Sequence, residues 1–315
     1  MKARLLEILV CPSYGNLYPL ELKDQEIKDQ EITSGILVCT HCQAKYPVRE
    51  SMPRFVDSDQ YADSFGFEWN QFNRVQLDVP GQSSESENTI KEKTNLTPER
   101  VTGKVVLDAG AGAGRFAEVI SRWGAKDVIA ADISSAVVAC YRNIGERENV
   151  HVIQADLFHL PLRRESFDIV YSIGVLHHTP NTRDAFREVS TFLKSGGFMA
   201  IYVYCITSGM GYSDHLRKIT TRLPKKLLYY LSILAVPIYY FYKVPVIGTM
   251  LSAFFPISMH PHWRWRWLDT FDWYTPTYQW KHTYPEVFRW FKEAGFVDID
   301  LPNTRHWICV TGRKG

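Results

Sequence analysis

Three glycines at alternate positions, directly after a short apolar run, constrain the fold of this chain more than any other feature. The run ends at Asp108, and the glycines that follow it are Gly110, Gly112 and Gly114. Glycine lets a backbone turn sharply and approach a ligand closely. The pattern therefore predicts a buried strand, a tight loop and a helix over residues 115–123, with a binding site at the carboxyl edge of a parallel sheet.

The alternation of strands and helices continues beyond this loop. Further strands are expected at residues 127–132, 150–154, 167–173 and 197–204, with helices at 134–147 and 182–194. A last helix at 285–294 and strands at 297–301 and 307–311 complete the pattern. Strands separated by helices favour a parallel sheet covered on both faces, so we predict an α/β, Rossmann-like fold.

The composition excludes several other classes of protein. Of 315 residues, 45% are hydrophobic and 22% are charged, which is typical of globular domains. The 36 basic and 34 acidic residues leave a net charge of +2, too balanced for a chain that mainly wraps nucleic acid. No apolar run reaches the ~20 residues of a membrane-spanning helix, and the first residues lack a secretion signal. We therefore expect a cytoplasmic protein with reduced cysteines.

Two acidic residues indicate the ligand. Asp132 ends the second strand, where a carboxylate can accept hydrogen bonds from the hydroxyls of a ribose. Asp156 follows the third strand, where it can accept from the amine of adenine, with Leu157 against the ring. Arg115 stands where a dinucleotide-binding loop carries its last glycine, and the chain has no phosphate-binding loop. A nucleoside without phosphates beside a glycine loop points to S-adenosylmethionine.

Taken in order, these segments resemble the class I S-adenosylmethionine-dependent methyltransferases, in particular those of ubiquinone and menaquinone biosynthesis. The resemblance is carried by residues 106–116, 130–134, 154–157, 167–180 and 193–197. It implies a methyltransferase domain over residues 103–315. It also implies cofactor contacts from Asp108, Gly110, Ala111, Gly112, Gly114, Asp132, Ile133, Asp156, Leu157 and Ile173. Asp108 could instead mainly fix the backbone of the loop.

His177 and His178 are the candidate catalytic residues. They follow the fourth strand, at the edge of the sheet where the ligand is expected. One of them could act as a general base, a role that contributes about 10²–10⁴-fold. Alternatively, they shape the pocket or cap the next helix, because an in-line displacement depends mainly on a well-oriented acceptor.

Residues 1–57 are expected to form a small ribbon-like β module, with short strands at residues 5–10, 36–39 and 45–48. Residues 5–12 and 46–53 resemble the opening and closing stretches of the zinc-ribbon-like methyltransferase activator family. The resemblance implies that the module packs against the methyltransferase domain. Tyr14 replaces one of the four expected cysteines, so we expect no bound metal. If zinc binds, its ligands are Cys11, Cys39 and Cys42, with a fourth from His41, Tyr14 or water.

Two more segments complete the predicted organisation. Residues 58–102 indicate an aromatic helix or arm followed by a polar linker, whose residues 82–95 could be a loop or an exposed helix. Residues 206–284 indicate an α-rich insertion. The insertion places a basic cluster, from Arg217 to Lys226, before two uncharged apolar runs that are too short to cross a membrane. Two interpretations remain open, a lid over the acceptor or a segment that lies on an anionic membrane surface.

The function predicted from the sequence is S-adenosylmethionine-dependent methyl transfer, to an oxygen atom of a small-molecule or lipid-linked acceptor. The first alternative is an RNA methyltransferase, although the balanced charge disfavours nucleic acid as a partner. The second is a non-catalytic scaffold that kept the fold, against which the intact Gly110, Gly112, Asp132 and Asp156 argue. Membrane contact would place this cytoplasmic protein at the inner face of the membrane.

Overall fold

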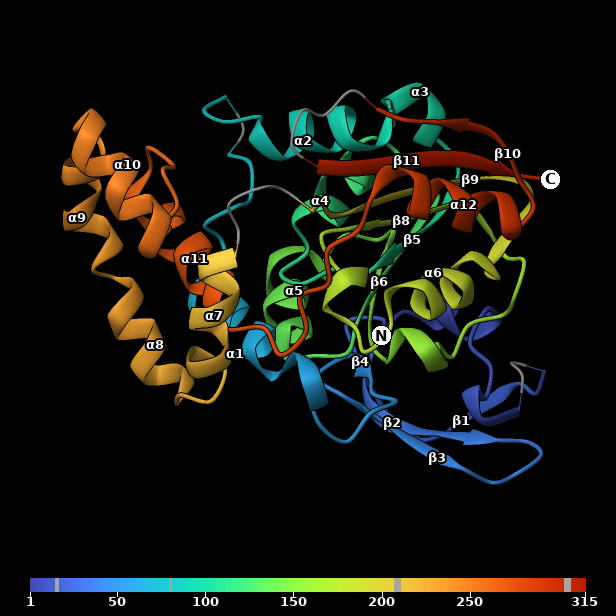
Figure 1. The fold of residues 1–315 in the computed structure, drawn as a ribbon. Helices are drawn as coiled ribbons and strands as arrows, with labels where there is room; N and C mark the ends of the chain where they lie inside the picture. The colour runs from blue at the N-terminus through green and yellow to red at the C-terminus, as the bar shows by residue number, and fades with distance from the viewer. Residues whose placement is uncertain (15–16, 80, 207–210, 303–306) are drawn as a thin grey trace.

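The computed structural model describes residues 1–14, 17–79, 81–206, 211–302 and 307–315. Its central element is a seven-stranded sheet in the order β10-β11-β9-β8-β5-β6-β7 (Figure 1). The strands are β5 (Val105–Ala109), β6 (Asp127–Asp132), β7 (Val150–Gln154), β8 (Phe167–Ile173), β9 (Leu193–Tyr204), β10 (Phe296–Asp300) and β11 (Trp307–Lys314). Strands β5 to β9 pair in parallel, whereas β11 is antiparallel to β9 and β10. The predicted α/β, Rossmann-like fold is confirmed.

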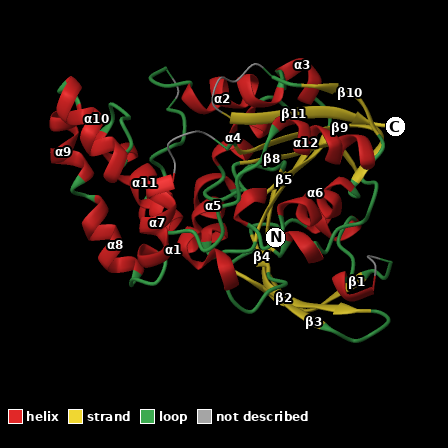
Figure 2. Ribbon diagram, in the orientation of Figure 1, coloured by secondary structure: helices red, strands yellow, loops and turns green. Residues whose placement is uncertain are grey.

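Helices cover both faces of this sheet (Figure 2). They are α4 (Arg115–Arg122) and α5 (Ala136–Ile144) on one face, and α6 (Thr182–Ser190) and α12 (Tyr284–Glu293) on the other. Successive side chains of a strand point to opposite faces. Val106 accordingly belongs to the core with α4 and α5, and Leu107 to the core with α6 and α12.

The N-terminal module is a four-stranded antiparallel sheet, at the lower edge of Figure 1. Its strands are β1 (Leu20–Lys28), β2 (Glu31–Cys39), β3 (Lys45–Arg49) and β4 (Met52–Pro53). The strand expected at residues 5–10 is wrong, because Ala3–Glu7 forms a 3-10 helix that buries Leu5. Leu5 and Leu9 share one hydrophobic core with Leu107 of the large sheet, so the module is packed into the body of the protein.

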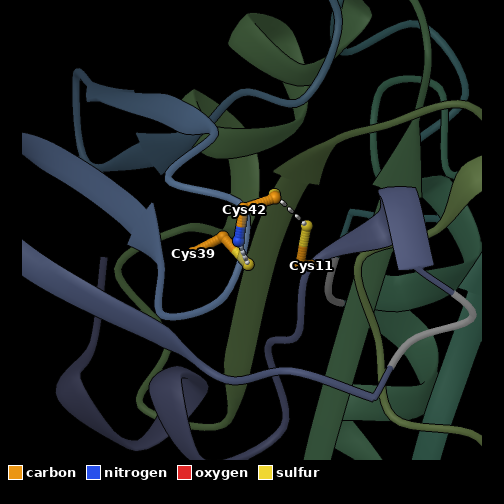
Figure 3. A group of neighbouring side chains, drawn as sticks. All are labelled: Cys11, Cys39 and Cys42. Atoms are coloured by element: carbon orange, nitrogen blue, oxygen red, sulfur yellow. Dashed lines mark hydrogen bonds between the residues drawn. The ribbon is translucent and has the colours of Figure 1, made fainter.

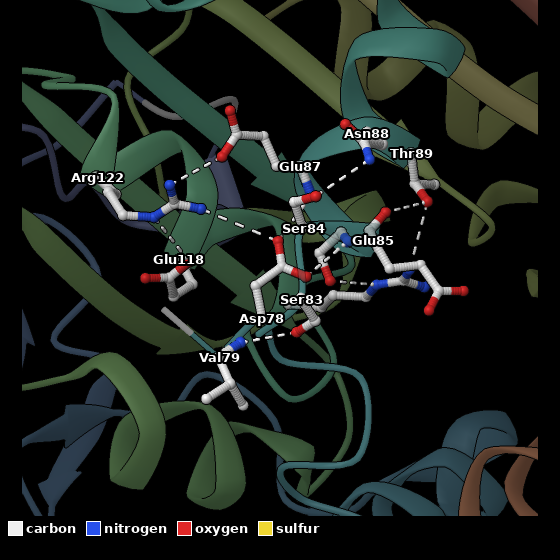
Figure 4. A network of polar contacts seen from close by, with 12 residues as sticks. Asp78, Val79, Ser83, Ser84, Glu85, Glu87, Asn88, Thr89, Glu118 and Arg122 are labelled. Carbon is white, nitrogen blue, oxygen red and sulfur yellow. Dashed lines mark hydrogen bonds and ion pairs between the residues drawn. The ribbon is translucent and has the colours of Figure 1, made fainter. Parts of the chain in front are cut away.

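The segment between the module and the large sheet is mostly helical, which agrees with the helical alternative for both the aromatic arm and the polar linker. Residues 58–102 contain α1 (Asp63–Gln71), α2 (Glu85–Thr94) and α3 (Pro98–Val101). Helix α2 buries Ile90 and is fixed to α4 by polar contacts (Figure 4). Arg122 pairs with Glu87 at 2.8 Å and with Glu118 at 3.5 Å, while Asp78 accepts from the backbone N–H of Glu87 at 2.9 Å.

The described part of the insertion contains five helices joined by loops. Its helices are α7 (Gly211–Thr220), α8 (Lys225–Ser232), α9 (Ala235–Tyr242), α10 (Pro245–Phe254) and α11 (Trp263–Tyr274). Helices α8 to α10 project to the left of the body in Figure 1, whereas α11 packs against α1. Among the described residues, no helix has the length and apolar character needed to cross a membrane.

Candidate functional site

A cavity of about 460 Å³ lies at the carboxyl edge of the large sheet, where the sequence predicts the ligand. It is lined by the loops that follow β5, β6 and β8 and by the end of β9. Helices α1, α2 and α11 form further walls, together with Leu157 after β7 and Trp307 of β11. The volume falls within the ~300–1,000 Å³ that is typical of small-molecule sites.

Gly110 and Gly114 show why the loop after β5 requires glycine. Gly110 has a φ of +98°, and its backbone N–H donates to the carbonyl of Ala131 at 2.8 Å. A Cβ at Gly110 would lie 2.3 Å from Cγ1 of Val175, so no side chain fits there. Gly114, with φ +85°, precedes α4, and a Cβ there would lie 2.8 Å from Cδ1 of Ile144 on α5. Gly110 therefore lines the cavity, whereas Gly114 allows α4 and α5 to approach closely.

The Asp132 carboxylate organises the centre of the cavity. Its Oδ2 accepts from the backbone N–H of Gly112 at 2.9 Å. Its Oδ1 accepts from the backbone N–H and the hydroxyl of Ser134, at 2.9 and 2.7 Å. Burial raises the pKa of Asp132, although these hydrogen bonds act in the opposite direction. Asp132 lines the cavity, and its Oδ2 accepts one of these three hydrogen bonds. A carboxylate oxygen can accept two, so Oδ2 can also accept a hydrogen bond from a ligand hydroxyl.

The other predicted cofactor residues divide into two groups. Those that line the cavity are Gly110, Ala111, Gly112, Asp132, Ile133, Leu157 and Ile173. Asp108, Gly114 and Asp156 are outside the lining. Asp108 is buried behind the loop, and burial raises its pKa to about 7. Asp156 accepts from the hydroxyl of Tyr61 at 3.3 Å, and Tyr61, which the sequence analysis missed, lines the cavity in its place.

The two histidines occupy different positions. His178 lines the cavity, and its Nδ1 donates to the carbonyl of Tyr278 at 2.8 Å, which leaves Nε2 as an acceptor. Burial lowers the pKa of His178 to about 4. His177 is fully buried outside the lining, with its ring centroid 3.9 Å from that of Tyr204. His177 therefore lies outside the lining of this cavity, and the structure favours His178 as the histidine nearer a ligand, while the assignment of a catalytic base stays a prediction.

Sequence analysis missed most of the helical lining of the cavity. The lining residues on α1 and α11 are three or four positions apart, a spacing that places their side chains on one face of each helix. Such residues are Phe65, Glu68 and Trp69 on α1, and Trp265, Leu268, Asp269 and Asp272 on α11. This spacing is the signal that could have found them, but by itself it is equally typical of a packing face.

The three N-terminal cysteines lie together (Figure 3). The sulfur atoms of Cys11, Cys39 and Cys42 are all within 4.8 Å of one another, and those of Cys11 and Cys42 are 3.7 Å apart. Burial acts to raise the pKa of Cys39, but hydrogen bonds from the backbone N–H groups of Cys42 and His41 lower it overall. Three thiolates are the larger part of a structural zinc site. The expectation of a metal-free module stays a prediction, and the side chain of Tyr14 lies outside the described residues.

The comparisons with known proteins agree with this architecture. Residues 107–201 match the methyltransferase domain family, and residues 2–51 match the Trm112p-like protein family. The chain therefore combines a class I methyltransferase fold with a Trm112p-like module.

Two curated relatives and one solved structure illustrate the range of the matches. The tRNA (carboxymethyluridine(34)-5-O)-methyltransferase of Saccharomyces cerevisiae is 32% identical over 120 residues, 37% of this chain and 41% of the relative. The 24-methylenesterol C-methyltransferase 2 of Arabidopsis thaliana is 24% identical over 165 residues, 50% of this chain and 46% of the relative. A complex of the Haloferax volcanii Trm112 methyltransferase activator with a methyltransferase has a TM-score of 0.48 and 12% identity, covering 79% of this chain and 96% of that chain.

The chain spans less than half the length of these two curated relatives. They act on different classes of acceptor, as their names state. The narrower resemblance to enzymes of ubiquinone and menaquinone biosynthesis therefore stays a prediction.

Proposed function

We propose that the protein transfers a methyl group from S-adenosylmethionine to an oxygen atom of a small-molecule or lipid-linked acceptor. One observation carries the proposal: the Asp132 carboxylate lines a cavity beside the glycine loop. Both lie within residues 107–201, which match the methyltransferase domain family. The yeast relative, whose name specifies transfer to a 5-O position, supports oxygen as the receiving atom.

The cavity residues fit the cofactor. Oδ2 of Asp132 can accept a hydrogen bond from a ribose hydroxyl, and Ile133 and Leu157 offer apolar contacts to a base. Gly110 has no side chain, so a ligand can approach the backbone of the loop closely at this position. When bound, S-adenosylmethionine supplies a methyl group on a positively charged sulfur.

The chain's own contribution to the reaction is mainly orientation. Nε2 of His178 can take a proton from the acceptor, but a group whose pKa is about 4 is a weak base at pH 7. Holding the acceptor in line with the methyl group can contribute up to ~7–11 kcal/mol in well-oriented cases. We therefore assign His178 to the cavity wall, with proton acceptance as a secondary role.

Calorimetry with S-adenosylmethionine and S-adenosylhomocysteine tests the cofactor assignment. Metabolite and lipid extracts, incubated with the protein and methyl-labelled cofactor, then identify the acceptor by mass spectrometry. Binding with transfer of label supports the proposal. Binding with no labelled product from any extract would support the non-catalytic scaffold.

The exposed surface of the insertion favours an acceptor at a membrane. Helices α8 to α10 leave many large apolar side chains in solvent, among them Leu227, Leu231, Tyr240, Phe241, Val246, Met250 and Phe254. The basic cluster expected beside them is smaller than predicted. Arg217 is buried and donates to the carbonyls of Trp273 and Pro276, and Lys225 pairs with Asp63. The exposed members are Lys218, Arg222 and Lys226.

We expect the protein to bind anionic liposomes at low salt, and less as salt rises. Each exposed basic residue near the surface contributes about 1 kcal/mol. Replacing Lys218, Arg222 and Lys226 together by Gln should therefore weaken binding at least tenfold in a sedimentation assay. Cofactor affinity should not change, because none of the three residues lines the cavity. A wild-type protein that stays in the supernatant at low salt would contradict the membrane assignment.

An RNA acceptor is the second candidate, because the yeast relative is named as a tRNA methyltransferase and the N-terminal module is Trm112p-like. Filter binding with labelled tRNA separates the two proposals. Retention of tRNA at 150 mM salt, followed by its methylation, would favour RNA over a small or lipid-linked acceptor.

A further inference from the structure

The cavity has two ends of different chemistry. The glycine loop, Asp132 and Leu157 form the end to which we assign the nucleoside. The other end is lined by Glu68 of α1 and by Asp269 and Asp272 of α11, whose charges act on Tyr204 of β9. Strands β6 and β9 are separated by β5 and β8, so the two ends lie across the sheet edge from each other. With the nucleoside at the first end, the acceptor occupies the second.

Glu68 is a buried acid of the second end. It lines the cavity, its exposed fraction is 0%, and neither carboxylate oxygen has a hydrogen-bond partner among the described residues. A buried polar group with no partner is costly, and native structures leave few of them. Helix α1 is held against α11 beside it, with the ring centroids of Phe67 and Phe271 5.8 Å apart.

Two more carboxyl groups, those of Asp269 and Asp272 on α11, line the same end. Oδ1 of Asp272 has no hydrogen-bond partner among the described residues, while Asp269 accepts from the hydroxyl of Ser258 at 3.0 Å. Burial, and then the charges of Asp272 and Asp269, raise the pKa of Glu68 well above its ordinary value. A cation placed among the three carboxyl groups would favour their charged forms and would offset the repulsion between their negative charges.

Three basic side chains around this end have contacts of their own, although the charge of Arg115 also acts on Asp269. Arg115 donates to the hydroxyl of Ser86 at 3.0 Å and to the side chain of Gln76 at 3.2 Å. The ammonium group of Lys93 lies 3.7 Å from the ring centroid of Tyr202. Arg217 donates to two backbone carbonyls, although its charge offsets part of that of Asp272.

The three carboxyl groups do not form a metal site. In the described part of the chain, the three cysteines of the N-terminal module are the one group of three or more His, Cys, Asp or Glu side chains whose ligand atoms lie close enough together to hold an ion. Aromatic side chains line the same cavity, with Phe65, Tyr204, Trp265, Trp273 and Trp307 among them. Aromatic faces together with carboxylates suit an organic cation.

We propose that the second end of the cavity binds an acceptor that carries an ammonium group, which Glu68, Asp269 and Asp272 hold while the methyl group is transferred elsewhere on the molecule. This inference rests on the proposed function, because it takes the first end as the cofactor site. It narrows the acceptor class to cationic organic molecules.

Two matched pairs of probes test this inference. Tyramine is compared with 4-ethylphenol, and choline with 3,3-dimethyl-1-butanol, each pair differing mainly in the positive charge. Binding is measured by calorimetry with the full chain saturated with S-adenosylhomocysteine, so that the cofactor end is occupied. We expect at least one cation to bind about tenfold or more tightly than its neutral partner, the effect of one charged hydrogen bond.

The variants Glu68→Gln and Asp272→Asn should reduce this preference to less than about threefold, while the neutral probes bind as before. Glu92→Gln is the matched control, because Glu92 lines the cavity but is exposed to solvent. Equal binding of cation and neutral partner, or a preference that survives Glu68→Gln, would overturn the inference. Cation binding that disappears when S-adenosylhomocysteine is present would also overturn it. Failure of S-adenosylhomocysteine itself to bind would count against the proposed function instead.

Discussion

Removal of residues 1–57 is expected to lower the melting temperature of the remaining chain by about 10 °C or more, or to leave it insoluble. The module buries Met1, Leu5, Leu9 and Leu37 in the same core as Leu107 of the large sheet. Full burial of each such side chain contributes about 1.5–3 kcal/mol. A loss of about 5 kcal/mol corresponds to roughly 10–20 °C for a chain of this size.

Backbone contacts add to the effect of this deletion. The N–H of Val10 donates to the carbonyl of Pro161 at 2.9 Å, and that of Phe55 to the carbonyl of Gln154 at 2.8 Å. The ammonium group of Lys2 donates to the carbonyls of Gly145 and Val150, at 2.7 and 2.9 Å. These contacts tie the module to strand β7, the end of α5 and the loop at Pro161, so its removal should loosen more than one element.

A pair of leucine variants keeps this test interpretable if the truncated chain does not fold. Leu9→Ala, at a position 1% exposed, should cost about 2–5 kcal/mol. Leu17→Ala, at a position 75% exposed, should change stability by less than about 0.5 kcal/mol. Differential scanning calorimetry measures both. An unchanged melting temperature after deletion, with full solubility, would mean that the module is an independent tether.

The fold was predictable because its signals are local. The glycine loop after β5, the acid at the end of β6 and the alternation of strands and helices all lie within short stretches of sequence. The apolar run of residues 5–10 was misassigned because a short run does not distinguish a strand from a helical turn. Helix α2 was expected as a loop or an exposed helix because its buried face is narrow and includes the polar Ser86 and Thr94 beside Ile90.

The cofactor end of the cavity was also more predictable than the acceptor end. Residues after parallel strands meet at one edge of a sheet, so their neighbourhood follows from the fold. The direction of each side chain does not follow from the fold. Asp108 and His177 were therefore expected to line the cavity, whereas both are buried outside its lining. Glu68 and Asp272 come from helices far apart in sequence, and their meeting depends on how α1 packs on α11.

Asp132→Ala is expected to weaken the binding of S-adenosylmethionine by at least tenfold. A hydrogen bond from a ribose hydroxyl to a charged acceptor contributes about 1.5–3 kcal/mol, and each 1.4 kcal/mol is a factor of ten in affinity. The same carboxylate also holds the backbone N–H groups of Gly112 and Ser134. Its removal therefore loosens the glycine loop in addition to deleting the ligand contact, and the loss should exceed that of one hydrogen bond.

Calorimetry on three further variants separates these two contributions. Asp132→Asn keeps an oxygen that can accept from one backbone N–H but loses the charge, so its affinity should fall between wild type and Asp132→Ala. Asp184→Ala removes an exposed carboxyl on α6 and should leave affinity unchanged. Asp156→Ala should have a smaller effect than Asp132→Ala, since Tyr61 separates Asp156 from the cavity. Wild-type affinity in Asp132→Ala would contradict the ribose assignment, whereas a larger loss in Asp156→Ala would restore Asp156 as a direct ligand of the base.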